Sequence, residues 1–285
     1  METKPNKFPY LDAHKVAQSF KLLLYLLLLA NFGYYLFEDL VRARHTLTDT
    51  STLLDWTENF TTTIDEIGWF ALLLIYELET YLLDDVDWSG WVANILSVVK
   101  VFCFVMIGHT LVANTNALID IYGAALATDT NDLCDFANQD LSWVFNLEYT
   151  SITAETCKIL PTSDAYFFVP EEPVVTTFSG LQLQRELTWF DLIESSAWLF
   201  VVIAIELSVR ITDRGITSGV LVSSLNWLKV VLYLLILGIG FYWAWLGHWV
   251  YLWDEILWIG GFAILEMNLD TWRTEINEKL DAGGF

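Results

Sequence analysis

The chain has few basic residues. It contains 14 Lys and Arg against 36 Asp and Glu, which gives a formal net charge of −22 at pH 7. Binding to nucleic-acid phosphates requires basic patches, so this balance excludes nucleic acid as a natural partner. Charged residues of all kinds make up only 18% of the chain, whereas 55% is hydrophobic and the mean hydropathy is +0.45. A soluble domain of 285 residues would carry more charge, so we expect a membrane protein.

The sequence also lacks the short motifs that mark catalysis, metal binding and phosphate binding. It has no HExxH motif, CxxC pair, His-rich cluster or glycine-rich phosphate loop, and no Ser-His-Asp arrangement is evident. We therefore expect neither an enzyme nor a protein with a metal or a cofactor.

Only three cysteines are present, and their settings differ. Cys103 lies in an apolar run, where a buried free thiol behaves as a small hydrophobic side chain. Cys134 and Cys157 lie in the one long polar stretch. We predict a disulfide between these two if that stretch faces an oxidising compartment.

Long apolar runs are abundant, and a membrane-spanning helix needs about 20 mostly apolar residues. The first run, 16–37, has the basic flank of a signal peptide, but no A-x-A-like cleavage site follows, so we expect a retained helix. The last run, 241–267, is rich in Trp but is interrupted by Asp254 and Glu255, so it either spans or lies at the interface. Spanning is favoured. The other predicted helices cover about 64–83, 90–117, 190–211 and 219–243.

The predicted fold class is an all-α polytopic membrane bundle of about six transmembrane helices with a small extracytoplasmic cap. Lys and Arg prefer the cytoplasmic side, and the positions of these residues place both tails in the cytoplasm and the cap outside a plasma or inner membrane. The expected segments are a tail (1–15), the first helix with hairpin 1 (16–127, hairpin 64–117), the acidic cap (128–186), hairpin 2 with the last helix (187–268, hairpin 190–243) and a second tail (269–285).

The chain contains an internal sequence repeat. A shift of 129 residues without a gap brings identical residues together, and Asp65 then falls on Glu194 with its charge kept. We predict a parallel internal repeat of a two-helix hairpin, related by a pseudo-twofold axis along the membrane normal. The identical residues are Ile64, Trp69, Glu77, Leu78, Asp84, Ser89, Gly90, Leu96 and Lys100, which fall on Ile193, Trp198, Glu206, Leu207, Asp213, Ser218, Gly219, Leu225 and Lys229.

The repeated charges lie at similar depths. Glu77 precedes Asp84 by about 10 Å of helix, and Lys100 follows Ser89 by about 16 Å, at 1.5 Å per residue. A lysine side chain can bend back toward the interface, so we expect Glu77 to meet Lys100. The second copy predicts the same pair between Glu206 and Lys229. A charge alone at mid-membrane would cost at least about 2.5–3.5 kcal/mol, which makes a partner or water necessary.

Polar residues accompany each lysine at intervals of three. Because residues three apart share a helix face, each hairpin has a polar stripe that faces something other than lipid. The stripes consist of Asn94 and Ser97 before Lys100, and of Ser223 and Asn226 before Lys229.

These charges allow two interpretations. The ion pairs and polar stripes either hold the hairpins together or line a hydrated path. The leading hypothesis is a channel or transporter for small ions, cations or protons, fed by the acidic cap. The alternative is a non-catalytic structural or accessory subunit of a larger membrane complex. The expected neighbours are membrane lipid, small ions, and either further copies of the chain or partner membrane subunits.

Overall fold

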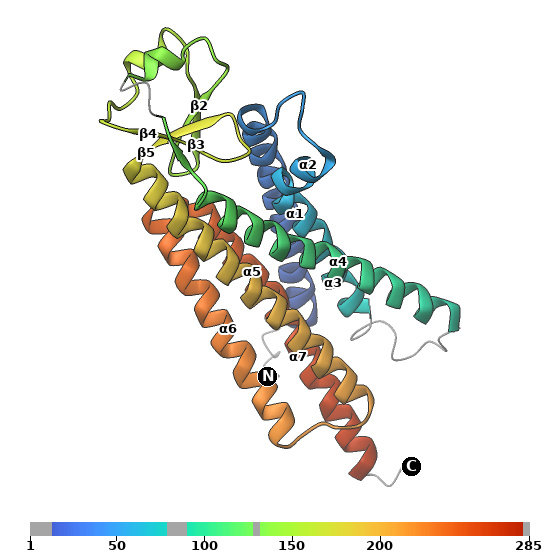
Figure 1. Cartoon of the computed structure of the whole chain (residues 1–285). Helices are drawn as coiled ribbons and strands as arrows, with labels where there is room; N and C mark the ends of the chain where they lie inside the picture. Colours follow the sequence, from blue (N-terminus) through green and yellow to red (C-terminus); the bar gives the residue numbers. More distant parts are fainter. Residues whose placement is uncertain (1–12, 79–89, 128–131, 282–285) are drawn as a thin grey trace, which may run out of the picture.

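The computed structural model describes residues 13–78, 90–127 and 132–281, and it is mostly helical (Figure 1). The first predicted turn, at Asp84 to Ser89, therefore lies outside the described residues, as does most of the N-terminal tail. The described helices are α1 (Ala13–Thr46), α2 (Leu53–Asn59), α3 (Thr61–Glu77), α4 (Gly90–Ile121), α5 (Phe178–Asp213), α6 (Val220–Trp245) and α7 (Trp249–Asp281).

Four helices in the described part of the chain are long and apolar enough to cross a membrane. They contain the spans Gln18–Thr46, Asn94–Ile121, Phe178–Asp213 and Val220–Trp245. The expectation of about six spans is therefore not confirmed. The described part of α3 has 17 residues, and the 33 residues of α7 include several acidic and basic side chains.

Two helix boundaries differ from the prediction: the end of α1 and the start of α7. α1 continues nine residues beyond the apolar run, to Thr46, because the polar Asp39 and Thr46 lie on its buried face. The run 241–267 is not one helix. α6 extends to Trp245, the chain turns at Gly247 with a φ of 102°, and α7 begins at Trp249.

The bundle packs around α7, which contacts α1, α3 and α6 (Figure 1). Its buried residues recur at helical spacing, as expected for an apolar face turned to the core. α3 and α4 approach closely at Gly68, where an added Cβ would lie 3.3 Å from the Met106 Cβ and 3.4 Å from the Cys103 carbonyl oxygen. The buried core residues of α7 are Leu257, Trp258, Phe262, Leu265 and Leu269.

The cap is folded, but as a sheet, so the all-α description is wrong for this region. Five strands lie in the order β1-β4-β5-β2-β3, with β2 parallel to β5 and the other pairs antiparallel. Aromatic and β-branched residues, which favour strands, fill its core. The strands are β1 (Ala125–Leu126), β2 (Ser142–Phe145), β3 (Glu148–Ser151), β4 (Tyr166–Phe168) and β5 (Val174–Thr177).

The tip of the β2–β3 hairpin attaches the cap to the top of the bundle. Asn146 and Leu147 form its two-residue turn with φ values of 52° and 64°, the positive pair that suits the twist of a hairpin. The Asn146 side-chain amide donates a 3.0 Å hydrogen bond to the Leu246 carbonyl in the α6–α7 turn. Leu147 packs against a cluster that includes Leu187 and Trp243, which explains an apolar residue at a strained turn position.

A second attachment joins the cap to α1. An Arg42 guanidinium nitrogen lies 3.7 Å from a Glu172 carboxylate oxygen, and the His45 ring stacks on Tyr149 with centroids 5.7 Å apart. His45 Nδ1 also lies 2.9 Å from the Ser142 hydroxyl. Burial raises the pKa of Glu172 above its usual range, while Arg42 acts in the opposite direction. Burial likewise raises the pKa of Tyr149 to about 12.

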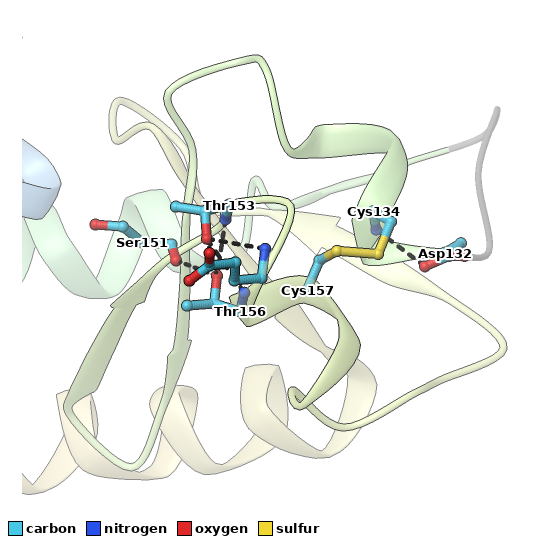
Figure 2. Close-up of a disulfide and its surroundings, with 7 residues drawn as sticks. Asp132, Cys134, Ser151, Thr153, Thr156 and Cys157 are labelled. Atoms are coloured by element: carbon cyan, nitrogen blue, oxygen red, sulfur yellow. Dashed lines mark hydrogen bonds between the residues drawn. A yellow bond between two sulfur atoms is a disulfide. The ribbon is translucent and has the colours of Figure 1, made fainter.

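The predicted cysteine pair is present within the cap. Cys134 and Cys157 form a disulfide between two short 3-10 helices, with their Cα atoms 5.0 Å apart (Figure 2). Beside it, the Thr156 hydroxyl donates a 2.7 Å hydrogen bond to the Ser151 carbonyl, which holds the second cysteine segment against β3. Cys103 is a buried free thiol in α4.

Removing this disulfide should loosen the cap without disturbing the helices. The bond closes a segment with a sequence separation of 23, so we expect the double variant Cys134→Ser/Cys157→Ser to lose about 2–4 kcal/mol of cap stability. Limited proteolysis should then cut the cap faster, while the helical circular dichroism stays unchanged. In the control Cys103→Ala, the cap should be cut faster under reducing than under oxidising conditions, as in the wild type. Equal proteolysis of wild type and double variant would contradict the prediction.

Candidate functional site

Three lysine–glutamate pairs connect antiparallel helices in the half of the bundle that lies away from the cap. Each lysine comes from a helix that runs toward the cap, and each glutamate comes from a helix that runs back (Figure 1). We call this set the ion-pair layer. Its pairs are Lys21 with Glu77, Lys100 with Glu206 at 3.3 Å, and Lys229 with Glu266 at 2.5 Å.

All four charges singled out from the sequence lie in this layer, but their partners differ from the expected ones. Glu77 pairs with Lys21 instead of Lys100, and Lys229 pairs with Glu266 instead of Glu206. Successive helix residues point about 100° apart. Tyr76 therefore faces Lys100, whose ammonium lies 5.5 Å from the centre of its ring, and the next side chain, Glu77, turns toward α1 and α7.

Additional hydrogen bonds surround the two glutamates of the repeat. Glu77 accepts from the Tyr25 hydroxyl at 3.2 Å and from the Asn268 amide at 3.4 Å. Glu206 accepts from the Arg210 guanidinium at 2.6 Å, one turn further along α5. Such additional donors offset the desolvation cost of a buried ion pair.

Lys229 is the most buried of the three lysines. Its side chain is 3% exposed, and besides Glu266 it contacts the Ser208 hydroxyl at 3.5 Å. An ammonium this deep requires an acid beside it, since burying an unpaired charge costs several kcal/mol.

The predicted polar stripes are not in this layer. Asn94, Ser97, Ser223 and Asn226 are all exposed on the outer faces of α4 and α6. In the first half of α6 the buried positions include Val222, Leu225 and Lys229, so Ser223 and Asn226, each one place after a buried residue, point away from the bundle. Ser223 and Asn226 instead line a shallow groove on the outer surface of α6, beside Gly219 and Trp227.

A second polar layer lies nearer the cap. It contains five acidic side chains from α3, α5 and α7, which we call the carboxyl cluster: Asp65, Glu66, Glu194, Asp254 and Glu255. Among the described residues, no salt bridge involves any of the five.

The carboxyl cluster is bonded mainly by neutral donors. Four of its members each accept a hydrogen bond from a tryptophan indole N–H, and Asp254 accepts from the Asn31 amide at 2.5 Å. The Thr110 hydroxyl donates to Asp65 at 2.9 Å. The indole bonds run from Trp69 to Asp65 (2.9 Å), from Trp258 to Glu66 (3.2 Å), from Trp243 to Glu194 (3.0 Å) and from Trp198 to Glu255 (3.0 Å).

Sequence reasoning missed this cluster, although a spacing in the chain marks it. An acid, a Trp four residues later and a Glu eight residues after that occur once in each of α3, α5 and α7. The shift of 129 residues detects the first two occurrences, whereas Asp254 and Glu255 stand out in the sequence only as an interruption of an apolar run. The three occurrences are Asp65, Trp69 and Glu77; Glu194, Trp198 and Glu206; and Asp254, Trp258 and Glu266.

An aromatic layer separates the two polar layers. The rings of Trp69 and Trp198 lie 5.5 Å apart, and Phe262 contacts both of them and Trp258. All four residues are buried. From each Trp of the motif to its Glu, the helix rises about 12 Å at 1.5 Å per residue, so the layers are joined by packed apolar side chains.

The described residues contain no group of three or more His, Cys, Asp or Glu side chains arranged to hold a metal ion.

The chain has no significant match among protein-family models, curated proteins or solved structures.

The ion-pair layer can be tested through its most buried pair. We expect Glu266→Gln to lower the free energy of unfolding by about 3–5 kcal/mol, because it leaves the Lys229 ammonium buried without its acid. The double variant Lys229→Met/Glu266→Gln should lose clearly less than the sum of the two single variants. Unfolding in mixed detergent micelles measures all three.

The matched control is Arg210→Gln. Arg210 also pairs with a glutamate of the layer, but its side chain is 67% exposed, so we expect a loss below about 1 kcal/mol. Additive losses at Lys229 and Glu266 would show that the two side chains do not stabilise each other.

Proposed function

We propose that this protein spans a membrane and transports small cations or protons across it. One observation carries the proposal: acidic side chains occupy two levels on the same three helices, α3, α5 and α7, inside a bundle whose other helices are strongly apolar. Ionisable groups in such an apolar setting are costly, and they usually mark ion or proton pathways.

The distribution of Lys and Arg supports an orientation with the cap outside. The inner end then carries Lys21 and Arg210 among other basic residues, and the connections at the other end carry fewer for their length. The cap is rich in acidic residues, which raise the local concentration of cations above the bundle.

The aromatic layer favours a gated transporter over an open pore. Trp69, Trp198, Trp258 and Phe262 close the space between the two polar layers, and Leu72 and Val201 are fully buried beside them. An ion moving between the layers requires these side chains to separate, and hydrophobic constrictions of this kind act as gates.

Three related hairpins account for the pattern better than two. The hairpins are α1 with α3, α4 with α5, and α6 with α7, each joined at the cap side and each containing one lysine–glutamate pair. Each lysine has a polar residue three positions before it and an aromatic residue four positions after it. The sets are Gln18, Lys21 and Tyr25; Ser97, Lys100 and Phe104; and Asn226, Lys229 and Tyr233.

Flux measurements on purified protein in liposomes test the proposed transport. We expect uptake of protons or monovalent cations that depends on the protein, and a reduction of roughly tenfold or more in Glu77→Gln and Glu206→Gln, because an amide no longer attracts the cation. Glu278→Gln, at an exposed position near the end of α7, should leave the flux unchanged. Flux equal to that of empty liposomes would contradict the proposed transport. So would variants that lose stability but keep wild-type flux per folded molecule.

The outer groove of α6 favours a second candidate, an accessory subunit of a membrane complex. Ser223 and Asn226 face outward, and Trp227 is 68% exposed beside them. Serine and asparagine on an outward face suit hydrogen bonds to a transmembrane helix of a partner subunit.

A pull-down in mild detergent distinguishes the two candidates. An accessory subunit should recover a membrane protein in stoichiometric amount, and Ser223→Leu/Asn226→Leu should abolish that recovery because the leucines remove the hydrogen-bonding groups. Val230→Leu, on the same exposed side of α6, is the control. Recovery of the chain alone, or of the same partner with both variants, would count against this candidate.

A further inference from the structure

The carboxyl cluster holds too many acidic side chains, too far from water, for all five to be negatively charged at once. Glu66 and Glu255 are 5% exposed and Asp254 is 8% exposed, while Asp65 and Glu194 are half-buried. Each of the five interacts electrostatically with at least one other member of the cluster. Like charges that interact in a poorly solvated setting repel strongly, so we expect some of these groups to bind a cation or a proton.

The groups around the carboxyl cluster offer little positive charge. α1 contributes Tyr35 and Asn31, α4 contributes Thr110, and α6 contributes Trp243, all of them neutral. Arg42 lies on the cap side of the cluster, where it interacts with Asp191 and with Asp39, Tyr149 and Glu172. The cluster is therefore neutralised by something other than a side chain of the described part of the protein.

Two details show where protons are needed. Glu66 Oε1 accepts from the Trp258 indole, whereas Glu66 Oε2 is buried and has no hydrogen-bond partner in the described part of the chain. A bare carboxylate oxygen in that position costs several kcal/mol, and a protonated Glu66 avoids this cost. The carboxyl groups of Glu194 and Glu255 interact with each other, and two adjacent carboxyl groups stop repelling each other when they share one proton.

We propose that the carboxyl cluster is a proton-binding site that holds at least two protons at neutral pH, one on Glu66 and one shared between Glu194 and Glu255. The site stands on side chains other than those of the ion-pair layer. It also deepens the proposed function, because it names the proton as the ion that the transporter handles, and for that part it rests on the proposed function.

The shared motif explains why the site lies on α3, α5 and α7. In each helix the acid is four residues before a tryptophan of the aromatic layer, so the three acids meet on the cap side of the three rings. Four indole N–H groups stabilise the carboxyl oxygens without adding charge. Neutral donors suit a carboxyl group that changes between protonated and ionised forms better than a lysine would, because a fixed positive charge favours only the ionised form.

Infrared spectroscopy of the purified protein tests the site without any transport. Protonated carboxyl groups give a C=O stretching band well separated from that of carboxylates, and the band shifts in heavy water. We expect such bands at pH 7, with one lost in Glu66→Gln and a different one lost in Glu255→Gln. Glu278→Gln, at an exposed position, should leave both in place.

A second measurement covers the case in which a variant fails to fold. Protonated carboxyl groups ionise when they reach water, so unfolding the wild-type protein in a weakly buffered solution at pH 7 should release at least two protons per chain. Absence of the bands together with no proton release would overturn the proposal. Bands that vanish on addition of sodium or calcium chloride at constant pH would assign the cluster to a metal cation instead.

The two proposals fail separately. Infrared bands and proton release in a protein that carries no flux in liposomes would leave the proton site intact and remove the transport function. Cation flux in a protein without protonated carboxyl groups would do the reverse.

Discussion

A lysine ammonium buried away from water costs several kcal/mol unless an acid lies against it. The bundle meets this requirement at three lysines, each time with the same arrangement. A lysine from a helix running toward the cap pairs with a glutamate from a neighbouring helix running back, and the helices that must pair are thereby brought together at one level. Lys229, at 3% exposure, leaves the least freedom, since α6 and α7 can separate there only by leaving a charge without its partner.

The two polar layers solve the same problem by different means. In the ion-pair layer, opposite charges offset each other, which stabilises a single arrangement of the helices. In the carboxyl cluster, indole and amide groups bond to the acids but leave their charge uncompensated. The first layer holds the helices together along the proposed path, and the second is suited to a change of protonation. This division is why the bound protons are assigned to the second layer.

The sequence predicted which charged residues lie inside the bundle better than it predicted their partners. The 129-residue repeat identified Glu77, Lys100, Glu206 and Lys229 as charges inside the bundle, because each recurs within an apolar run. It could not show that Tyr76, not Glu77, faces Lys100, since that depends on how α3 rotates against α4 around Gly68. The pair between Lys100 and Glu206 joins residues 106 apart, beyond any local pattern.

Other parts of the fold were predicted unevenly for similar reasons. The cysteine pair followed from its polar setting, and the long polar stretch indicated a small cap. The sheet itself was missed, because its strands have at most four residues and one of its pairings is parallel, so no clear alternation marks it. The copy of the motif in α7 was missed because its offset from the second copy is 60 residues, not 129.

The distances along the chain within the three ion pairs also bear on how the protein is made. Lys229 and Glu266 are 37 residues apart and Lys21 and Glu77 are 56 apart, so each of these pairs is complete soon after its lysine leaves the ribosome. Lys100 must wait for Glu206 until the entire cap has been synthesised. In the proposed membrane setting, α4 can therefore leave the insertion machinery as a stable helix only after the cap has crossed and α5 has followed it. The middle hairpin thus has the longest interval between the synthesis of its lysine and that of its glutamate, because the cap lies between them.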